Sequence, residues 1–194
     1  AEHICSRSPG FEKIRFMNSG TEAIMVSIKA ARAFTGRPRI AKVEGAYHGG
    51  YDYAEVSQTP NPDTWGSIDH PNNVPVVHGT PASALDDVVI IPFNDVDRAM
   101  AILDEHAKDI AGILLDLMPH RVGLNPVERP FLDALREWAD RHGALLLLDE
   151  VITFRSSYGG LQERYGIHAD LTAMGKMIGG GFPVGAVAGR ADVM

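Results

Sequence analysis

The feature that most constrains this chain is an apolar run that ends in a carboxylate. Five apolar residues, Ala144 to Leu148, stand directly between Gly143 and Asp149. A continuous apolar run of this length is typical of a strand that is buried on both faces, as in a parallel sheet. Asp149 would then lie at the carboxyl end of the strand, where open parallel sheets bind their ligands. We therefore expect an α/β fold with a ligand site at Asp149.

Further short apolar stretches complete a pattern in which strands mostly alternate with helices. The seven predicted strands lie near residues 14, 40, 89, 112, 146, 172 and 186. Segments with a helical pattern lie between them, such as residues 95–107, where apolar residues fall on one face of the predicted helix. This alternation predicts an open, mainly parallel seven-stranded sheet with helices on both faces, a three-layer α/β/α architecture with right-handed crossovers. Residues 57–87 show neither period, and we expect them to cover the crevice or to meet a second subunit.

Lys176 is the second candidate for the crevice, because it follows a short predicted strand at residues 171–174. A lysine beside glycines is more often a solvated loop residue than a nucleophile. Its combination with Asp149 favours chemistry, since an amine that forms a Schiff base and a carboxylate that keeps a ring nitrogen protonated are what a pyridoxal phosphate site needs. Glycines 179–181 do not form a nucleotide-binding P-loop, because the lysine precedes them and Met177 follows it.

An anion site is indicated at Asn18 to Glu22, which opens a predicted helix at residues 21–35. The first backbone N–H groups of a helix are free to bind an anion, so Ser19, Gly20 and Thr21 would hold the phosphate. An ordinary helix cap explains the same residues, and it is the favoured explanation when this segment is considered alone. The presence of phosphate, ring and amine anchors in one chain favours the cofactor.

Four motifs resemble those of the class III pyridoxal phosphate aminotransferases, which are enzymes of fold type I, and they occur in the family's order. The motifs are Asn18-Ser19-Gly20-Thr21-Glu22-Ala23, Glu44-Gly45-Ala46-Tyr47-His48-Gly49, Asp149-Glu150-Val151-Ile152-Thr153 and residues 175–186 around Lys176. The resemblance covers nearly all of the chain, and residues 184–189 resemble the family's one antiparallel strand. The closest branch is similar to glutamate-1-semialdehyde 2,1-aminomutase and its transaminase relatives.

The resemblance implies a role for each residue of the predicted site. The residues that would bind pyridoxal 5'-phosphate are Ser19, Gly20, Thr21, Tyr47, His48, Asp149, Val151 and Lys176. Lys176 would bind the cofactor and then act as general acid and base, while Asp149 would keep the pyridinium nitrogen protonated. Tyr47 and Val151 would pack on opposite faces of the ring. From sequence alone, a buried core position for Tyr47 is equally consistent with its residue type.

Two reactions share this chemistry. In a transaminase the amino group passes from a small-molecule donor to a keto acid or aldehyde, whereas in the aminomutase the same skeleton takes it back at the neighbouring carbon. Ile152 replaces the Gln that is usual in the ornithine and GABA branch, which favours the semialdehyde-like branch. Asp116-Leu117, in place of the usual Glu-Pro, and the segment 57–87 argue against a strict aminomutase. We expect a transaminase, with the aminomutase as the alternative and a non-catalytic cofactor-binding module as a further one.

Two cations follow the predicted strand at residues 111–115. His120 and Arg121 could bind a substrate carboxylate, because arginine offers a two-pronged donor. A surface salt bridge is the favoured interpretation.

Composition limits the partners of the chain. The net charge is −7, with 18 Lys and Arg against 25 Asp and Glu, which argues against nucleic-acid binding. The apolar runs reach about five residues, against the roughly 18 that span a membrane. His3 and Cys5 have no second pair at ligand spacing, so no metal site is predicted.

The length and the single cysteine lead to expectations about the whole protein. The chain has 194 residues, one Cys and no initial Met. Members of the resembled family are roughly twice as long as one ordinary domain. We therefore expect residues 1–194 to be the cofactor-binding large domain of a longer cytoplasmic homodimer, without its N-terminal segment and its C-terminal small domain.

Overall fold

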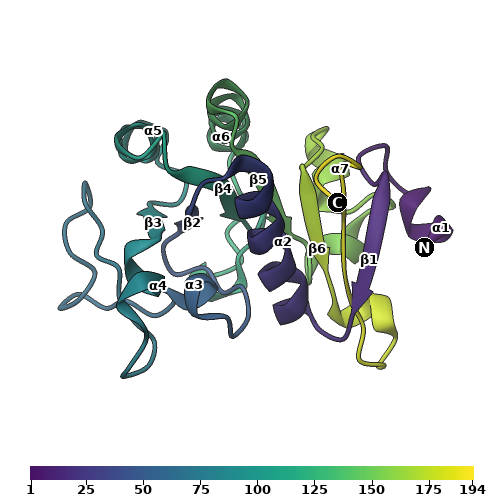
Figure 1. Ribbon diagram of the computed structural model, residues 1–194, viewed down its shortest axis with the longest axis horizontal. Helices are drawn as coiled ribbons and strands as arrows, with labels where there is room; N and C mark the ends of the chain where they lie inside the picture. The colour runs from purple at the N-terminus through teal and green to yellow at the C-terminus, as the bar shows by residue number, and fades with distance from the viewer.

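The seven predicted strands all form and join in one sheet, in a computed structural model that describes residues 1–194 (Figure 1). In chain order they are β1 (Lys13–Met17), β2 (Arg39–Val43), β3 (Val88–Ile91), β4 (Ile110–Leu115), β5 (Leu145–Asp149), β6 (Leu171–Met174) and β7 (Gly185–Gly189). Across the sheet the order is β1-β7-β6-β5-β4-β2-β3. Strands β2 to β6 pair in parallel, whereas β7 is antiparallel to both β6 and β1. The predicted α/β fold, with its one antiparallel strand, is confirmed.

Helices lie on both faces of this sheet (Figure 1). The α-helices are α1 (Glu2–Cys5), α2 (Gly20–Thr35), α3 (Asp52–Glu55), α4 (Ala82–Asp86), α5 (Val96–Glu105), α6 (Arg129–His142) and α7 (Leu161–Tyr165), and the 3-10 turns are η1 (His120–Val122), η2 (Thr153–Ser156) and η3 (Lys176–Gly179). Helix α2 packs on one face, and α5 and α6 pack on the other. None of the helices has both the length and the apolar character needed to cross a membrane.

The apolar run that defines β5 supplies a hydrophobic core on each face. Leu145 and Leu147 belong to the core under α2, while Leu146 and Leu148 belong to the core under α5 and α6. Alternation of this kind follows from the two-residue period of a strand. Burial of each leucine contributes about 1.5 to 3 kcal/mol. Because β5 is held from both sides, Asp149 at its end has a fixed position.

Helix α6 connects to β5 through a glycine turn. The helix ends at Gly143, whose φ of 65° lies in the left-handed region that glycine adopts at little cost. Helix α2 ends in the same way at Gly36, with a φ of 70°. Each turn sends the chain from a helix back toward the sheet.

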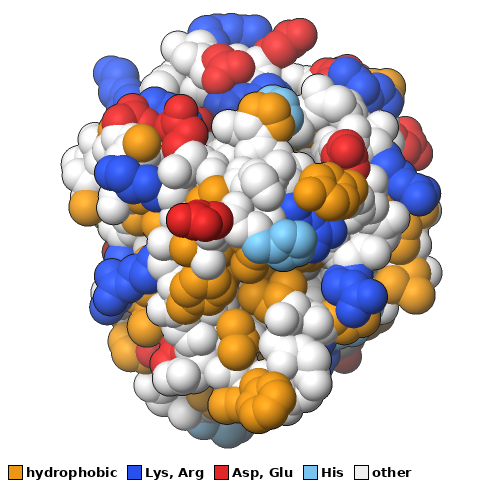
Figure 2. Space-filling model, turned by 90° about the vertical axis from the view of Figure 1, so that its right-hand side faces the viewer, with side chains coloured by type: hydrophobic (Ala, Val, Ile, Leu, Met, Phe, Trp, Pro, Cys, Tyr) orange, Lys and Arg blue, Asp and Glu red, His pale blue; other side chains and the backbone are white.

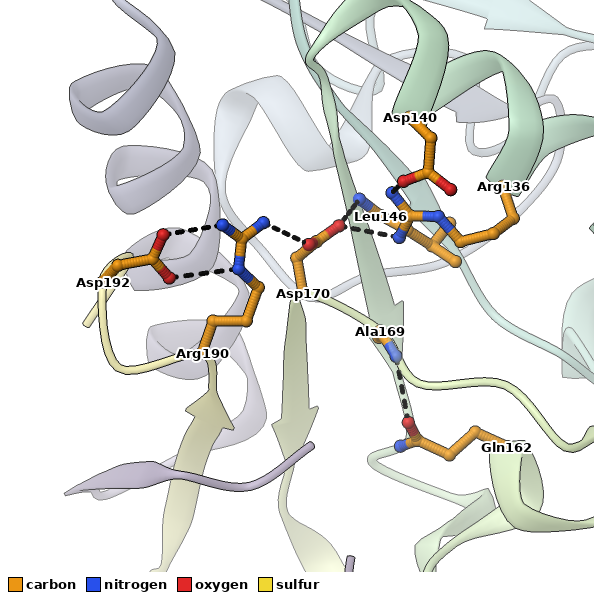
Figure 3. Close-up of polar contacts among 8 residues, drawn as sticks. All are labelled: Arg136, Asp140, Leu146, Gln162, Ala169, Asp170, Arg190 and Asp192. Carbon is orange, nitrogen blue, oxygen red and sulfur yellow. Dashed lines mark hydrogen bonds and ion pairs between the residues drawn. The ribbon is translucent and has the colours of Figure 1, made fainter. Parts of the chain in front are cut away.

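The amino end of β6 is tied to its neighbours by Asp170 (Figure 3). Its Oδ2 accepts hydrogen bonds from Arg136 Nη1 and from the backbone N–H of Leu146, both at 2.7 Å. Its Oδ1 accepts from Arg190 Nη1 at 2.8 Å. Asp170 therefore joins α6, β5 and the segment after β7.

The segment 57–87 lies beside β3, at the edge of the sheet far from β1 (Figure 1). It consists of turns and the short helix α4, and its first residue is anchored by a hydrogen bond of 2.9 Å from the backbone N–H of Val74 to Ser57 Oγ. None of its residues lines the pocket described below. The expectation that the segment covers the crevice is therefore wrong, and contact with a second subunit stays a prediction.

Candidate active site

A pocket of about 120 Å³ opens at the carboxyl ends of β4, β5 and β6. All eight residues predicted to bind the cofactor line it: Ser19, Gly20, Thr21, Tyr47, His48, Asp149, Val151 and Lys176. The remaining lining residues are Ile24, Gly49, Asp116, His120 and Ile152. Segments as far apart in sequence as Ser19 and Lys176 thus meet at the edge of the sheet where a ligand was expected.

Asp149 is held in place by two donors. Its Oδ1 accepts a hydrogen bond of 3.0 Å from the backbone N–H of Val151, and its Oδ2 lies 2.8 Å from His48 Nδ1. Burial lowers the pKa of His48, although Asp149 opposes the shift. A neutral His48 donates its Nδ1–H to the carboxylate, which fixes the orientation of Asp149. The other ring nitrogen of His48, Nε2, is buried without a partner.

Lys176 stands on a strained turn directly after β6. Its φ of 46° lies in the left-handed region, which residues with a β-carbon seldom adopt. The residue before it, Gly175, packs tightly, because a β-carbon there would lie 3.2 Å from the backbone nitrogen of Gly20. None of the ion pairs of the chain involves Lys176. The turn therefore presents an amine that is not committed to another side chain.

The start of α2 serves both as a capped helix end and as a possible anion site. Ser19 Oγ accepts a hydrogen bond of 3.2 Å from the N–H of Glu22, so the predicted cap is present. The first helical backbone bond runs from Ala23 N to Ser19 O. The N–H groups of Gly20 and Thr21 precede that bond and are left for an anion, which the helix dipole also favours. The two explanations of this motif are compatible.

Glycine at position 20 is required by the packing of the pocket. A β-carbon on Gly20 would lie 2.8 Å from Cγ2 of Val151, closer than such atoms approach in proteins. A β-carbon on Gly185 of β7 would collide with the carbonyl oxygen of Ser19. Larger residues at either position would push the start of α2 away from the loop after β5 or from β7.

The loop after β2 brings Tyr47 to the rim of the pocket, where it meets η1. The Tyr47 ring lies edge-to-face with His120, with the centroids 5.6 Å apart, and the guanidinium carbon of Arg121 lies 5.2 Å from its centroid. Arg121 forms no ion pair, so the predicted surface salt bridge is wrong. The reason is that η1 places both cations against Tyr47 rather than beside a carboxylate.

A model of the family described as aminotransferase class-III matches residues 1–194. The chain belongs to the class III aminotransferase family. Curated glutamate-1-semialdehyde 2,1-aminomutases from Nitratidesulfovibrio vulgaris and Caldivirga maquilingensis are 42% and 44% identical to it over 195 residues. The alignments cover 100% of this chain but 44% of each relative, so the chain spans less than half the length of these relatives.

Solved structures of class III relatives share the fold. An omega-transaminase from Sphaerobacter thermophilus is 52% identical, with a TM-score of 0.96, over 100% of this chain and 44% of its own. A β-phenylalanine aminotransferase from Variovorax paradoxus is 40% identical, with a TM-score of 0.80, over 100% of this chain and 40% of its own. The family and the fold expected from the four motifs are confirmed.

Lys42 supports the site but lies outside the four sequence motifs, so the motif comparison did not identify it. It is fully buried in β2, and its Nζ donates hydrogen bonds to the carbonyl oxygens of Ala46 at 3.1 Å and Val56 at 2.7 Å. These carbonyls belong to the two ends of the loop that carries Tyr47 and His48. Burial lowers the pKa of Lys42 to about 7, although Glu44 opposes the shift. Lys42 thus holds both ends of this loop through hydrogen bonds.

Asp116 is the second residue with a place in the pocket but no role drawn from sequence. The motif comparison marked Asp116-Leu117 only as a departure from the family. The structure places Asp116 directly after β4, buried and among the residues that line the pocket. Its burial and the neighbouring Asp149 raise its pKa to about 7. A polar residue directly after a buried strand was the signal that could have identified it.

Proposed function

We propose that the protein containing residues 1–194 transfers an amino group from an amine or amino acid to a keto acid or aldehyde, with pyridoxal 5'-phosphate as its cofactor. The observation that carries the proposal is the meeting of three anchors in one pocket. Lys176 offers an amine, Asp149 offers an oriented carboxylate, and the start of α2 offers free N–H groups. Pyridoxal phosphate has an aldehyde, a ring nitrogen and a phosphate in one small molecule.

The residues of the pocket fit this cofactor. Gly20 and Gly175 let the start of α2 approach the end of β6. The N–H groups that would bind a phosphate therefore lie beside the turn that carries the amine of Lys176. Tyr47 and Val151 supply flat and apolar surfaces for the ring. The buried Nε2 of His48, which lacks a partner in the chain, agrees with a site that a ligand completes.

Pyridoxal phosphate, when bound, supplies an aldehyde that takes up the amino group and a ring that accepts electron density. The chain's own residues prepare and control this chemistry. Asp149 would accept a hydrogen bond from the ring nitrogen and keep it protonated, and His48 and the N–H of Val151 hold that carboxylate in place. The Nζ of Lys176 would hold the aldehyde carbon of the cofactor and would move a proton to and from the substrate carbon.

Intermolecular transfer is the proposed reaction, and the aminomutase reaction is the second candidate. The omega-transaminase from Sphaerobacter thermophilus is 52% identical to this chain, which supports the first. The curated aminomutases, at 42% and 44% identity, support the second. A protein that binds the cofactor without turnover is the third possibility, because much of each relative lies outside the matched region.

We also propose that residues 1–194 are the cofactor-binding domain of a cytoplasmic homodimer. Large apolar side chains are exposed on η3, after η3 and on β1: Met177 is 46% exposed, Phe182 78% and Phe16 48%. Figure 2 shows hydrophobic side chains gathered in the lower half of the face that carries β1 and η3. An exposed apolar surface of this kind is typical of a protein contact. The free Cys5 agrees with a reducing compartment.

The role of Lys176 is tested by Lys176→Ala in the purified protein. We expect the visible absorbance of the covalently bound cofactor to disappear and amino transfer to fall by about a thousandfold or more, because no other amine lines the pocket. Lys29→Ala, a change at an exposed lysine of α2, is the matched control and should leave both properties unchanged. An unaltered cofactor spectrum in Lys176→Ala would exclude Lys176 from this role.

The reaction is identified by a screen of donors and acceptors that includes glutamate-1-semialdehyde. Product that forms only when a keto acid or aldehyde is added supports the transaminase. Rearrangement of glutamate-1-semialdehyde without any acceptor supports the aminomutase instead. Cofactor binding without turnover of any donor supports the non-catalytic module.

A further inference from the structure

Three neighbouring parallel strands each deliver an ionisable side chain to the same pocket. Asp116 follows β4, Asp149 ends β5, and Lys176 follows β6 by one residue. In the sheet Leu115 pairs with Leu148, which places Asp116 next to Asp149 along the edge. The proposed mechanism assigns roles to Asp149 and Lys176 but none to Asp116.

Asp116 differs from the other buried carboxylates in how few donors it has. Its Oδ1 accepts one hydrogen bond of 2.9 Å, from the backbone N–H of Met118, and no cation pairs with either oxygen. Glu150, in contrast, accepts bonds from Thr153 and Leu161 and also from both the backbone and the side chain of Gln162. The Oδ2 of Asp116 therefore has no partner within the chain, although the side chain is only 5% exposed.

A carboxyl group in this position is suited to hold a proton. Burial is the main cause that raises the pKa of Asp116 to about 7, and the charges of Asp149 and Glu150 add to it, while Lys176 and the Met118 N–H oppose it. Two carboxylates that share a site do not both ionise readily, and Asp149 already has two donors. With its pKa raised to about 7, Asp116 holds a proton in about half of the molecules near neutral pH and can then donate it.

The position of Asp116 relative to Gly20, Asp149 and Lys176 indicates which atom of a bound pyridoxal phosphate would lie next to it. The phosphate anchor at Gly20 touches Gly175 after β6, so the phosphate side of a bound ring lies toward β6. In pyridoxal phosphate the aldehyde carbon stands between the phosphate-bearing carbon and the carbon that carries the ring hydroxyl. With the ring nitrogen at Asp149 and the aldehyde at Lys176, the hydroxyl is directed toward β4. Ile152, which also lines the pocket, has no side-chain polar atom to offer.

Building on the proposed function, we infer that protonated Asp116 donates a hydrogen bond to the ring hydroxyl oxygen of pyridoxal phosphate. The hydroxyl oxygen carries negative charge in the reactive cofactor, so a neutral donor stabilises it, whereas an ionised carboxylate would repel it. Asp116 is thus a further cofactor-binding residue. It also tunes the charge of the ring next to the aldehyde that Lys176 binds.

The inference is tested by comparing the affinity of pyridoxal phosphate with that of 3-deoxypyridoxal phosphate, the analogue without the ring hydroxyl. The Lys176→Ala background keeps both compounds non-covalent. There we expect pyridoxal phosphate to bind about tenfold more tightly than the analogue, as for one hydrogen bond to a charged group. Asp116→Leu, which fills similar space without a donor, should bring the ratio to about one. Asp116→Asn, whose amide still donates and still accepts from Met118, should preserve the ratio.

Further measurements separate this bond from a structural role and from failure of the proposed function. In the Lys176-containing protein, Asp116→Leu should shift the absorbance maximum of the bound cofactor, which a purely structural change would leave in place. Asp116→Ala replaces Asp116→Leu if the leucine variant does not fold. An unchanged affinity ratio in the donor-free variant, or equal loss in Asp116→Asn, overturns the inference while the proposed function stands. Absence of any pyridoxal phosphate binding by the unmodified protein overturns both.

Discussion

Asp170 and Asp116 lie at opposite ends of the central strands, and their surroundings differ sharply. Asp170, before β6, receives two guanidinium donors and one backbone N–H (Figure 3). Asp116, after β4, receives a single backbone N–H. Both residues are nearly buried, with 6% and 5% of their surface exposed. The comparison shows that burial alone does not decide how a carboxylate is satisfied in this protein.

The difference follows from what each end of the sheet has to do. A buried charge that has all its partners keeps neighbouring elements together, and removal of one partner is costly. A group that lacks partners destabilises the fold by itself but is available to a ligand. Asp170 thus has its contacts complete within the chain, whereas Asp116 keeps an oxygen that a ligand could use. Asp149 is intermediate, since His48 and Val151 orient it without neutralising it.

The largest effect that the comparison predicts is on activity, from Asp149→Ala. We expect amino transfer to slow by about a thousandfold, because the ring nitrogen would lose the carboxylate that keeps it protonated. The free energy of unfolding should fall by about 1 to 2 kcal/mol, since the buried Nδ1–H of His48 would lose its one acceptor. Single-turnover assays and urea unfolding measure the two quantities. Near-normal turnover in Asp149→Ala would contradict the proposed role of this carboxylate.

Asp170→Ala should give the reverse result, a large loss of stability with activity retained. Arg136, Arg190 and the N–H of Leu146 would all lose their common acceptor. We expect the free energy of unfolding to fall by about 3 kcal/mol, with the turnover of the folded fraction within about twofold of normal. The matched control is Asp133→Ala, since Asp133 pairs with Arg129 on the exposed surface of α6 and should contribute little. Equal effects of the two substitutions would show that Asp170 does not lock the amino end.

A third predicted effect, which needs no substitution, is a change in stability with pH at the carboxyl end. The pKa of Asp116 is raised from 3.8 to about 7, so the folded state holds a proton that the unfolded state has lost. The stability from this group is fully present below pH 3.8 and is lost as the pH rises through about 7. The slope approaches about 1.4 kcal/mol per pH unit. Unfolding of the cofactor-free protein should show this limb, and Asp116→Asn should flatten it.

Lys42 should change the free energy of unfolding in the opposite direction at higher pH. Burial lowers its pKa from 10.5 to about 7, so between these values the unfolded state binds the additional proton. The free energy of unfolding should then rise with pH, with a slope that again approaches about 1.4 kcal/mol per pH unit. Lys42→Met should remove the rise and leave the limb due to Asp116. A flat profile above pH 7 in the unmodified protein would contradict the burial of Lys42.

The sheet and the composition of the pocket were accessible from sequence because both depend on local patterns. The run at 144–148 is buried on both faces, as its continuous apolar character predicts. The helix that begins at Gly20 and the strand that precedes Lys176 also lie where the periods placed them. Since parallel strands bring their carboxyl ends to one edge, Asp149 and Lys176 had to be neighbours once the strand order was right.

What sequence could not show depends on contacts between distant segments. A lysine in β2 is expected to reach solvent, and Lys42 is buried only because the loop from Ala46 to Val56 folds over it. Arg121 was expected to pair with a carboxylate, but η1 directs it over Tyr47. The segment 57–87 was expected at the crevice, but it packs beside β3 at the edge of the sheet. Local periods contain no information on such placements.

The left-handed backbone of Lys176 has a consequence for how this protein could change under selection. A φ of 46° suits glycine or asparagine better than lysine, so the amine that we propose to be catalytic is kept at a conformational cost of about 1 kcal/mol or more. Lys176→Gly should therefore yield a chain that is inactive and yet unfolds at a higher temperature than Lys176→Ala. A lineage that no longer needed the reaction would gain robustness by losing this lysine first, and glycine at position 176 in a homologue would indicate a descendant that has abandoned catalysis.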